Sequence, residues 1–291
     1  GGRVRKAAAR NRRGPSVPEQ RETLEGFTAS TFSHGGISHQ VFRAGAGPAV
    51  IVIHEIPGIH PGVVDLARRL IGRGYTVYLP SMFGTPGGAA GGPAIAKSIA
   101  KVCVSREFAI LANRSSPATS WLRALAAQAH QECGGPGVGA IGMCMTGSFA
   151  LAMALEPAVL APVMSQPGLP AGLTARRRAA VGLDDVELAQ VKARTGQGLR
   201  LLGLRFSNDR ACPAARFETM RREFGESFES IEIDSSPGNP FGISQSAHCV
   251  LTVDLVDAPG HPTEAALART IEFIGEQLRP GTGPRAGADG Q

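Results

Sequence analysis

The sequence has no apolar run of about 18 residues, the length that a helix needs to cross a membrane. It also has no C-x-x-C pair, a spacing typical of structural zinc sites. The number of cysteines is odd and their spacing is wide, which argues against a disulfide framework and for a reducing compartment. The five are Cys103, Cys133, Cys144, Cys212 and Cys249. These absences predict a cytoplasmic protein without a membrane-spanning helix, a disulfide or a metal site.

The net charge of +6 comes from the N-terminal segment alone. Residues 1–13 hold six of the 30 basic residues and no acidic residue, which leaves 24 basic residues against 24 acidic ones. The rest of the chain therefore does not indicate a basic face of the kind that binds nucleic acid. Contact of the basic residues 1–13 with nucleic acid is the alternative. The segment also lacks the apolar stretch of a secretory signal. We expect a disordered tail over residues 1–22, a single domain over 23–280, and a flexible tail over 281–291.

Apolar, β-branched runs alternate with segments of helical periodicity along the chain. Residues 48–55 form a continuous apolar run, as in a strand that is buried on both faces. Further strands are predicted at 76–79, 138–141, 159–165, 199–206 and 228–233, and helices at 63–72, 95–112, 118–132, 184–194, 214–224 and 262–278. Residues 26–42 indicate an edge hairpin, and residues 80–93, rich in Gly and Pro, a loop beside a site. This alternation predicts an α/β fold whose mostly parallel sheet carries helices on both faces.

The stretch VGAIGMCMTGSFAL, residues 138–151, places Cys144 at a tight turn between a strand and a helix that begins near Gly147. This is the layout of the G-x-S-x-G nucleophile elbow, with sulfur in place of oxygen. Small residues such as Gly142 allow the strand and helix backbones to approach closely. The N-terminal N–H groups of the helix would stabilise a thiolate. A buried core cysteine is the alternative.

A thiol nucleophile needs a base, and the base needs an acid that orients it. Asp209 follows a predicted strand directly, and His248 lies in the loop before the last helix. This order of nucleophile, acid and histidine is that of the α/β hydrolases. Because the carboxyl ends of parallel strands share one edge, we expect Cys144, Asp209 and His248 to meet there. Asp234 is the alternative acid, and His261, at a helix start where capping is common, is the alternative base.

Glu55 ends an otherwise apolar strand, so we expect a partly desolvated carboxylate with a raised pKa. A carboxylate that reaches solvent at the strand terminus is the alternative. The neighbouring His54 and His60 do not indicate a metal site. Their motif, H-E-I-P-G-I-H, is not H-E-x-x-H, and Pro57 and Gly58 prevent the helix that a zinc motif requires.

With VIVIHEIPGI at residues 50–59 and GMCMTG at residues 142–147, the chain resembles the dienelactone hydrolase family. Members of that family carry a strand-end Q/H-E-I-x-G and an elbow G-x-C-x-G-G, and the resemblance extends from about residue 42 to residue 278. It implies an α/β-hydrolase fold and cofactor-free hydrolysis of a lactone or carboxylic ester. The implied roles are Cys144 as nucleophile, His248 as base, Asp209 as its orienting acid, Glu55 as activator in contact with the resting thiol, and the backbone N–H groups of Met145 and Ile56 as oxyanion hole.

Two positions depart from the family pattern. Thr146 replaces the first Gly of the terminal pair of the elbow, where we expect it to crowd the turn. Thr252 stands where the dienelactone enzyme has a substrate-binding Arg, and Arg106 or Arg205 could supply a substitute cation. Dienelactone itself is therefore not the expected substrate. The alternatives to hydrolysis are a relative that only binds a small molecule and a redox-sensing thiol.

The expected partner is a small-molecule ester or lactone, with no nucleic acid and no membrane, and the chain is expected to be a monomer or a homodimer.

Overall fold

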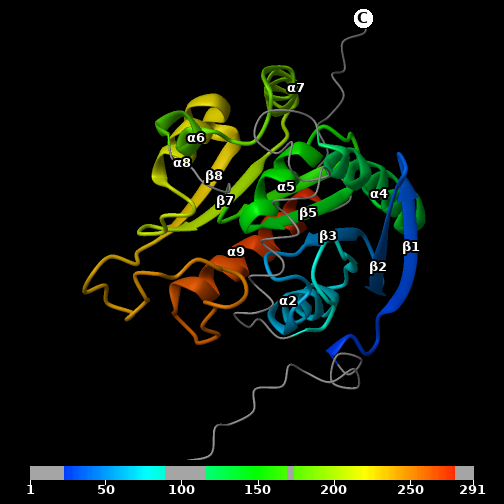
Figure 1. Ribbon diagram of the computed structural model, residues 1–291, viewed down its shortest axis with the longest axis horizontal. Helices are drawn as coiled ribbons and strands as arrows, with labels where there is room; N and C mark the ends of the chain where they lie inside the picture. The colour runs from blue at the N-terminus through cyan, green and yellow to red at the C-terminus, as the bar shows by residue number, and fades with distance from the viewer. Residues whose placement is uncertain (1–22, 89–115, 169–173, 279–291) are drawn as a thin grey trace, which may run out of the picture.

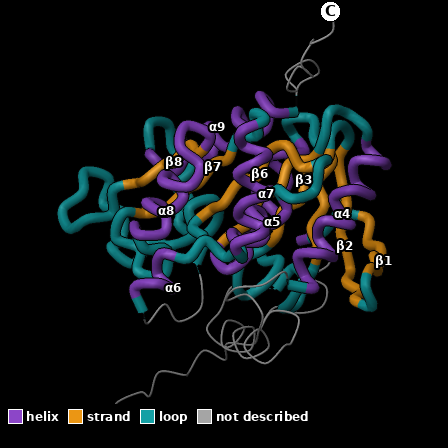
Figure 2. The backbone as a smooth tube through the Cα atoms, turned by 90° about the horizontal axis from the view of Figure 1, so that it is seen from above, coloured by secondary structure: helices purple, strands orange, loops and turns teal. Residues whose placement is uncertain are grey.

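The computed structural model describes residues 23–88, 116–168 and 174–278. Within them one sheet has the strand order β1-β2-β4-β3-β5-β6-β7-β8, with β1 and β8 at opposite ends (Figure 2). The strands are β1 (Thr28–His34), β2 (Ile37–Gly45), β3 (Ala49–Ile53), β4 (Thr76–Pro80), β5 (Val138–Met143), β6 (Val159–Ser165), β7 (Leu201–Phe206) and β8 (Phe228–Ile233). The pairs β1–β2 and β2–β4 are antiparallel, and the other neighbours are parallel. The predicted mostly parallel sheet is confirmed.

Helices connect the strands. They are α2 (Pro61–Ile71), α4 (Pro117–Cys133), α5 (Gly147–Met153), α6 (Ala175–Ala179), α7 (Asp185–Gly196), α8 (Ala214–Phe224) and α9 (Pro262–Gln277). The short α6 was not predicted, because it is a run of arginines and alanines with no buried side chain. The helix predicted at 95–112, the end of the loop at 80–93 and the predicted tails lie outside the described residues. No helix in the described part is long and apolar enough to span a membrane.

The two faces of the sheet are covered by different helices, which explains the unbroken apolar run of β3. Val50 and Val52 belong to a core cluster that includes residues of α2 and α9. Ala49, Ile51 and Ile53 belong to a second cluster with residues of α4 and α5. Alternate side chains of a strand point to opposite faces, so every residue of β3 is buried. Figure 1 shows α2 and α9 on one side of the central strands and α4 and α5 on the other.

The edges of the sheet follow the sequence pattern as well. The predicted edge hairpin is confirmed, since all of β1 pairs antiparallel with residues 37–43 of β2. Exposed polar residues dominate β1, which has no strand on its outer side in the part of the chain that the structure describes. At the opposite edge, β8 is only partly buried. Edge strands of this composition do not offer a flat apolar template to another chain.

Four parallel strands end at one edge of the sheet, and a polar residue of interest follows the carboxyl end of each. Glu55 follows β3, Cys144 follows β5, Gln166 follows β6 and Asp209 follows β7. Because β3, β5, β6 and β7 are neighbours in the sheet and run in the same direction, these residues emerge side by side.

Candidate active site

Cys144 occupies a strained turn between β5 and α5. Its φ is 55°, in the left-handed region that residues with a Cβ rarely adopt. It begins a short 3₁₀ turn, Cys144–Thr146, that leads into α5. A Cβ on Gly142 would lie 2.1 Å from the Thr146 carbonyl oxygen, and one on Gly147 would lie 2.8 Å from the Cα of Pro167. The close approach that small residues predicted at this turn is therefore confirmed.

Thr146 ties the nucleophile turn to the end of β3. Its side chain is fully buried, and its hydroxyl accepts a hydrogen bond from the Met143 N–H at 2.9 Å. The same hydroxyl lies 2.9 Å from the Ile53 carbonyl, to which it can donate. The side chain that we expected to crowd the elbow thus satisfies backbone groups of two neighbouring strands.

His248 lies between Asp209 and Cys144. Its Nδ1 donates to the Asp209 Oδ2 over 2.6 Å, and its ring is also hydrogen bonded to the Cys144 thiol. Asp209 is buried, and its Oδ1 accepts from the Ala211 N–H at 2.8 Å. Burial alone would lower the pKa of His248, but the hydrogen bonds and negative charges of Asp209 and Cys144 raise it to about 10. The structure thus brings together the three residues that the order along the sequence selected.

The two alternative residues have other partners. Asp234 is exposed and accepts a hydrogen bond from the Ser236 N–H at 2.8 Å, next to its own strand end. His261 is the N-cap of α9, where its Nδ1 accepts from the Thr263 N–H. These contacts assign Asp234 to a surface turn and His261 to a helix cap.

Glu55 is buried and surrounded by donors. Its Oε1 accepts from the His60 Nε2 at 3.1 Å and from the Thr252 hydroxyl, and its Oε2 accepts from the Gln166 Nε2 at 2.9 Å. The Cys249 thiol is a further hydrogen-bond partner. Burial raises the pKa of Glu55, but the hydrogen bonds from His60, Thr252 and Cys249 outweigh it and lower this pKa below its usual value. The raised pKa that we expected from the sequence is therefore wrong.

The thiol that contacts Glu55 is that of Cys249, whereas the resemblance implied the resting thiol of Cys144. No hydrogen bond between Glu55 and Cys144 occurs among those of the described residues. Burial and the nearby charges of Glu55 and Cys144 raise the pKa of Cys249. Neither Cys249 nor Gln166 was predicted from the sequence to belong to this site, although Gln166 follows a buried strand directly, which is the signal that identified Asp209.

The predicted oxyanion donors lie on the two segments that Thr146 joins. Met145 is buried and follows Cys144 in the 3₁₀ turn, and Ile56 is half-buried and follows Glu55. The role of their N–H groups stays a prediction.

Arg205 is one of two arginines predicted to contact substrate, and each nitrogen of its guanidinium has a hydrogen-bond partner within the protein. It is buried, its Nε donates to the Cys212 carbonyl at 2.9 Å, and its other nitrogens bind the Glu232 carboxylate and the Ser207 carbonyl. These bonds hold β7 to β8 and to the loop that follows β7, so the structure gives Arg205 a structural role in place of the expected contact with substrate. The other candidate, Arg106, lies outside the described residues.

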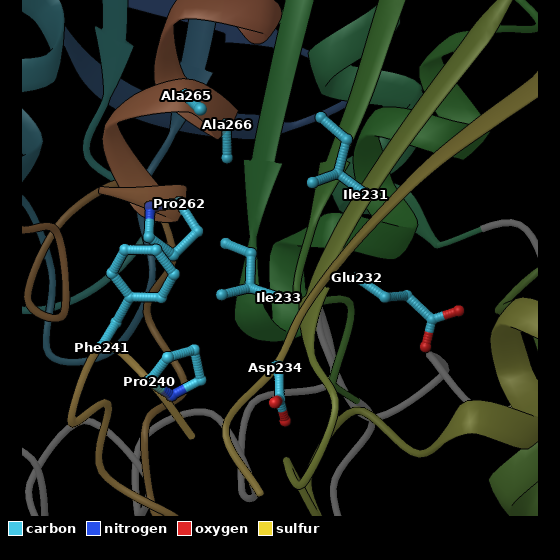
Figure 3. Close-up of a pocket in the computed structure, with 9 residues that line it drawn as sticks. All are labelled: Ile231, Glu232, Ile233, Asp234, Pro240, Phe241, Pro262, Ala265 and Ala266. Carbon is cyan, nitrogen blue, oxygen red and sulfur yellow. The ribbon is translucent and has the colours of Figure 1, made fainter. Parts of the chain in front are cut away.

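A cavity of about 330 Å³ lies at the outer edge of the sheet, between β8 and the start of α9. In Figure 3, Phe241 and Pro262 lie on one side of it and Ile231 and Ile233 on the other. Asp234 is at its border, but Cys144, His248 and Asp209 are not among the residues that line it. This cavity is therefore separate from the candidate catalytic residues.

The model of the dienelactone hydrolase family matches residues 38–276, which is most of the chain. The chain belongs to this family. The match begins at the second residue of β2, includes β3 to β8 and the elbow, and extends along α9 almost to its end. Family membership identifies the protein as an ester hydrolase with the α/β-hydrolase fold, as the sheet had indicated. No curated protein matches the sequence.

Solved structures of dienelactone hydrolases and esterases share the fold. The structure named m3DLH is 18% identical, with a TM-score of 0.57, and the match covers 87% of this chain and 98% of that one. The dienelactone hydrolase-like promiscuous phosphotriesterase P91, from metagenomic libraries, is 16% identical, with a TM-score of 0.53 over 87% of this chain and 100% of that one. Est1E from Butyrivibrio proteoclasticus is 14% identical, with a TM-score of 0.53 over 86% and 98%. At these identities the likeness concerns the fold.

Proposed function

We propose that this member of the dienelactone hydrolase family cleaves a carboxylic ester or lactone through an acyl-thioenzyme on Cys144. The observation that carries the proposal is the position of His248, which is hydrogen bonded both to Asp209 and to the thiol. A nucleophile, a base in contact with it and an acid that orients the base are the parts that nucleophilic catalysis needs.

The two half-reactions use the same groups. His248 takes the proton of Cys144, and the thiolate sulfur attacks the ester carbonyl carbon to form a tetrahedral intermediate. The N–H groups of Met145 and Ile56 donate to its oxyanion. The C–O bond then breaks, the alcohol leaves with the proton from His248, and Cys144 is acylated. In the second half, His248 takes a proton from water, the hydroxide attacks the thioester, and the carboxylic acid leaves as the thiol is restored.

The charge state of His248 suits the first step. A pKa of about 10 keeps its imidazole protonated at neutral pH. The proton on His248 is available to the leaving alkoxide when the C–O bond breaks. In this proposal Asp209 holds Nδ1 protonated and leaves Nε2 for the thiol.

The residues around the site also indicate the charge of the substrate. Thr252, at the position of the resembled enzyme's substrate-binding Arg, gives its hydroxyl to the buried Glu55. It adds no positive charge that would attract a carboxylate on the substrate. We propose an uncharged small ester or lactone rather than dienelactone itself.

Mass spectrometry after mixing with p-nitrophenyl acetate tests the proposal. The wild-type protein and a Cys133→Ser control, altered at a cysteine that contacts Tyr78 on β4, should release nitrophenol and carry a transient acetyl group on Cys144. Cys144→Ala should do neither. Turnover by Cys144→Ala at the wild-type rate would refute the nucleophile.

Redox sensing is the second candidate, because Cys249 is a second thiol beside Glu55. Its raised pKa disfavours the thiolate that disulfide formation needs, so we rank this function below hydrolysis. Reversible oxidation of Cys144 by peroxide without any esterase activity would reverse this ranking.

A further inference from the structure

The loop that carries the candidate base is fixed by side chains from other strand ends. In this histidine loop, residues 248–254, the Val250 N–H donates to the Gln166 Oε1 at 3.3 Å. The Thr252 hydroxyl donates to the Glu55 Oε1. The loop closes on itself through Asp254, whose Oδ2 accepts from the His248 N–H at 2.8 Å. The position of His248 therefore depends on polar groups at the ends of β3 and β6.

Gln166 is the residue in which these contacts converge. It is fully buried, and its φ is 35°, a left-handed conformation that is unfavourable for a residue with a side chain. Its Nε2 donates to the Glu55 Oε2 at 2.9 Å, while its Oε1 accepts from Val250 and from the Ser165 hydroxyl. A single amide thus connects the end of β3 to the histidine loop.

The backbone after Gln166 reaches the nucleophile. The Gly168 N–H donates to the Cys144 carbonyl at 2.9 Å. The carbonyl of Pro167, which lies between Gln166 and Gly168 in the sequence, accepts from the buried guanidinium of Arg216 on α8. A Cβ on Gly168 would lie 3.7 Å from both the Cys144 Sγ and the His248 Cε1. Residues 166–168 therefore contact the nucleophile turn at one end and hold the histidine loop at the other.

We propose that Gln166 is a positioning residue, whose amide fixes the histidine loop against Glu55 and so aligns His248 with the Cys144 thiol. The inference rests on the proposed function of this site. An amide is suited to the position because it donates to a carboxylate and accepts from a backbone N–H at the same time. Methionine would fill the volume and lose both bonds, and glutamate would place a second carboxylate beside Glu55.

The test compares Gln166→Met with Gln128→Met in p-nitrophenyl acetate hydrolysis. Gln128 is the matched control, since it also donates to a glutamate, Glu132, but on the exposed side of α4. Loss of an aligned catalytic group acts on the transition state, so kcat of Gln166→Met should fall about 10- to 100-fold at an unchanged KM. Gln128→Met should match the wild type. If kcat of Gln166→Met per folded molecule equals that of the wild type, Gln166 serves stability alone and the inference is overturned.

A second readout does not need hydrolysis. Alkylation of Cys144 by iodoacetamide, followed by peptide mass spectrometry, reports its thiolate as pH is varied. The profile should change in Gln166→Met and not in Gln128→Met, and an unchanged profile in both overturns the inference. If Cys144→Ala still hydrolyses ester, the proposed function fails, while this alkylation profile still decides the role of Gln166.

A donor–acceptor exchange keeps the inference testable if Gln166→Met does not fold. In the double variant Glu55→Gln, Gln166→Glu, the amide and the carboxylate change places. The oxygens that accept from Thr252 and Val250 remain, and the amide still donates across the pair. The double variant should have a higher kcat than either single variant. A double variant no faster than the slower single one would overturn the inference.

Discussion

Asp209→Asn tests how the acid controls the proton on His248. In the wild type, both carboxylate oxygens of Asp209 are acceptors, one from the Ala211 N–H at 2.8 Å and one from the His248 Nδ1 at 2.6 Å. Asparagine has a single side-chain oxygen. If this oxygen accepts from the Ala211 N–H, the NH₂ group faces His248 Nδ1 and forces the imidazole proton onto Nε2, the nitrogen that faces the thiol. If this oxygen instead accepts from His248 Nδ1, the Ala211 N–H loses its acceptor.

The size of the effect follows from these contacts. A histidine with its proton on the wrong nitrogen cannot accept the thiol proton, and the same change in a serine protease triad lowers kcat about 10⁴-fold. Removal of an adjacent negative charge should lower the pKa of His248 by about 1 to 3 units from its raised value. Loss of a hydrogen bond to a charged group should lower the free energy of unfolding by about 1.5–3 kcal/mol at pH 7.

Three measurements check this prediction: kcat with p-nitrophenyl acetate, the NMR titration of His248, and urea unfolding. Asp234→Asn is the control, because that exposed carboxylate follows the neighbouring strand and accepts from Ser236 instead. It should leave all three quantities near their wild-type values. A kcat of Asp209→Asn within about tenfold of the wild type would show that Asp209 does not control the proton on His248.

Two further predictions concern pH and the elbow. Since the pKa of His248 is about 10 in the fold and about 6.5 in the unfolded chain, its pairing with Asp209 stabilises the fold fully below pH of about 6.5. This stabilisation is lost as pH rises toward 10, so the difference in unfolding free energy between wild type and Asp209→Asn should shrink over that range in urea titrations. Gly142→Ala should lose activity and thermal stability, because its Cβ would lie 2.1 Å from the Thr146 carbonyl oxygen. Gly196→Ala, with open space at its Cβ, should keep both, and a fully active Gly142→Ala would contradict the geometry of the turn.

Those parts of the fold that depend on local pattern could be predicted from the sequence. The run at 48–55 gave β3, since a strand buried on both faces has no polar residue to interrupt it. Asp184 begins the helix predicted at 184–194, and it caps α7 in a reciprocal pair with Glu187. Asp209 and His248 could be selected because strand order places strand ends at one edge of the sheet. Their contact at 2.6 Å agrees with that selection.

The environment of Glu55 could not be predicted in the same way. Its burial was apparent from the apolar strand before it, and burial alone raises a carboxylate pKa. The donors that reverse the direction come from distant segments, and Thr252 is 197 residues away along the chain. A residue's neighbours in sequence do not reveal such partners, so Gln166 and Cys249 entered the site only through the structure.

The strand order has a consequence for how this site fails on heating. β5 lies inside the sheet, paired on both sides, so its amide hydrogens should exchange with solvent only when the whole domain unfolds. The histidine loop has no strand ladder and relies on side-chain acceptors, so it can open locally at a lower cost. Warming should therefore detach the base while the nucleophile turn keeps its shape. Hydrogen exchange at residues 248–254 should rise together with the loss of activity, below the temperature at which the sheet melts.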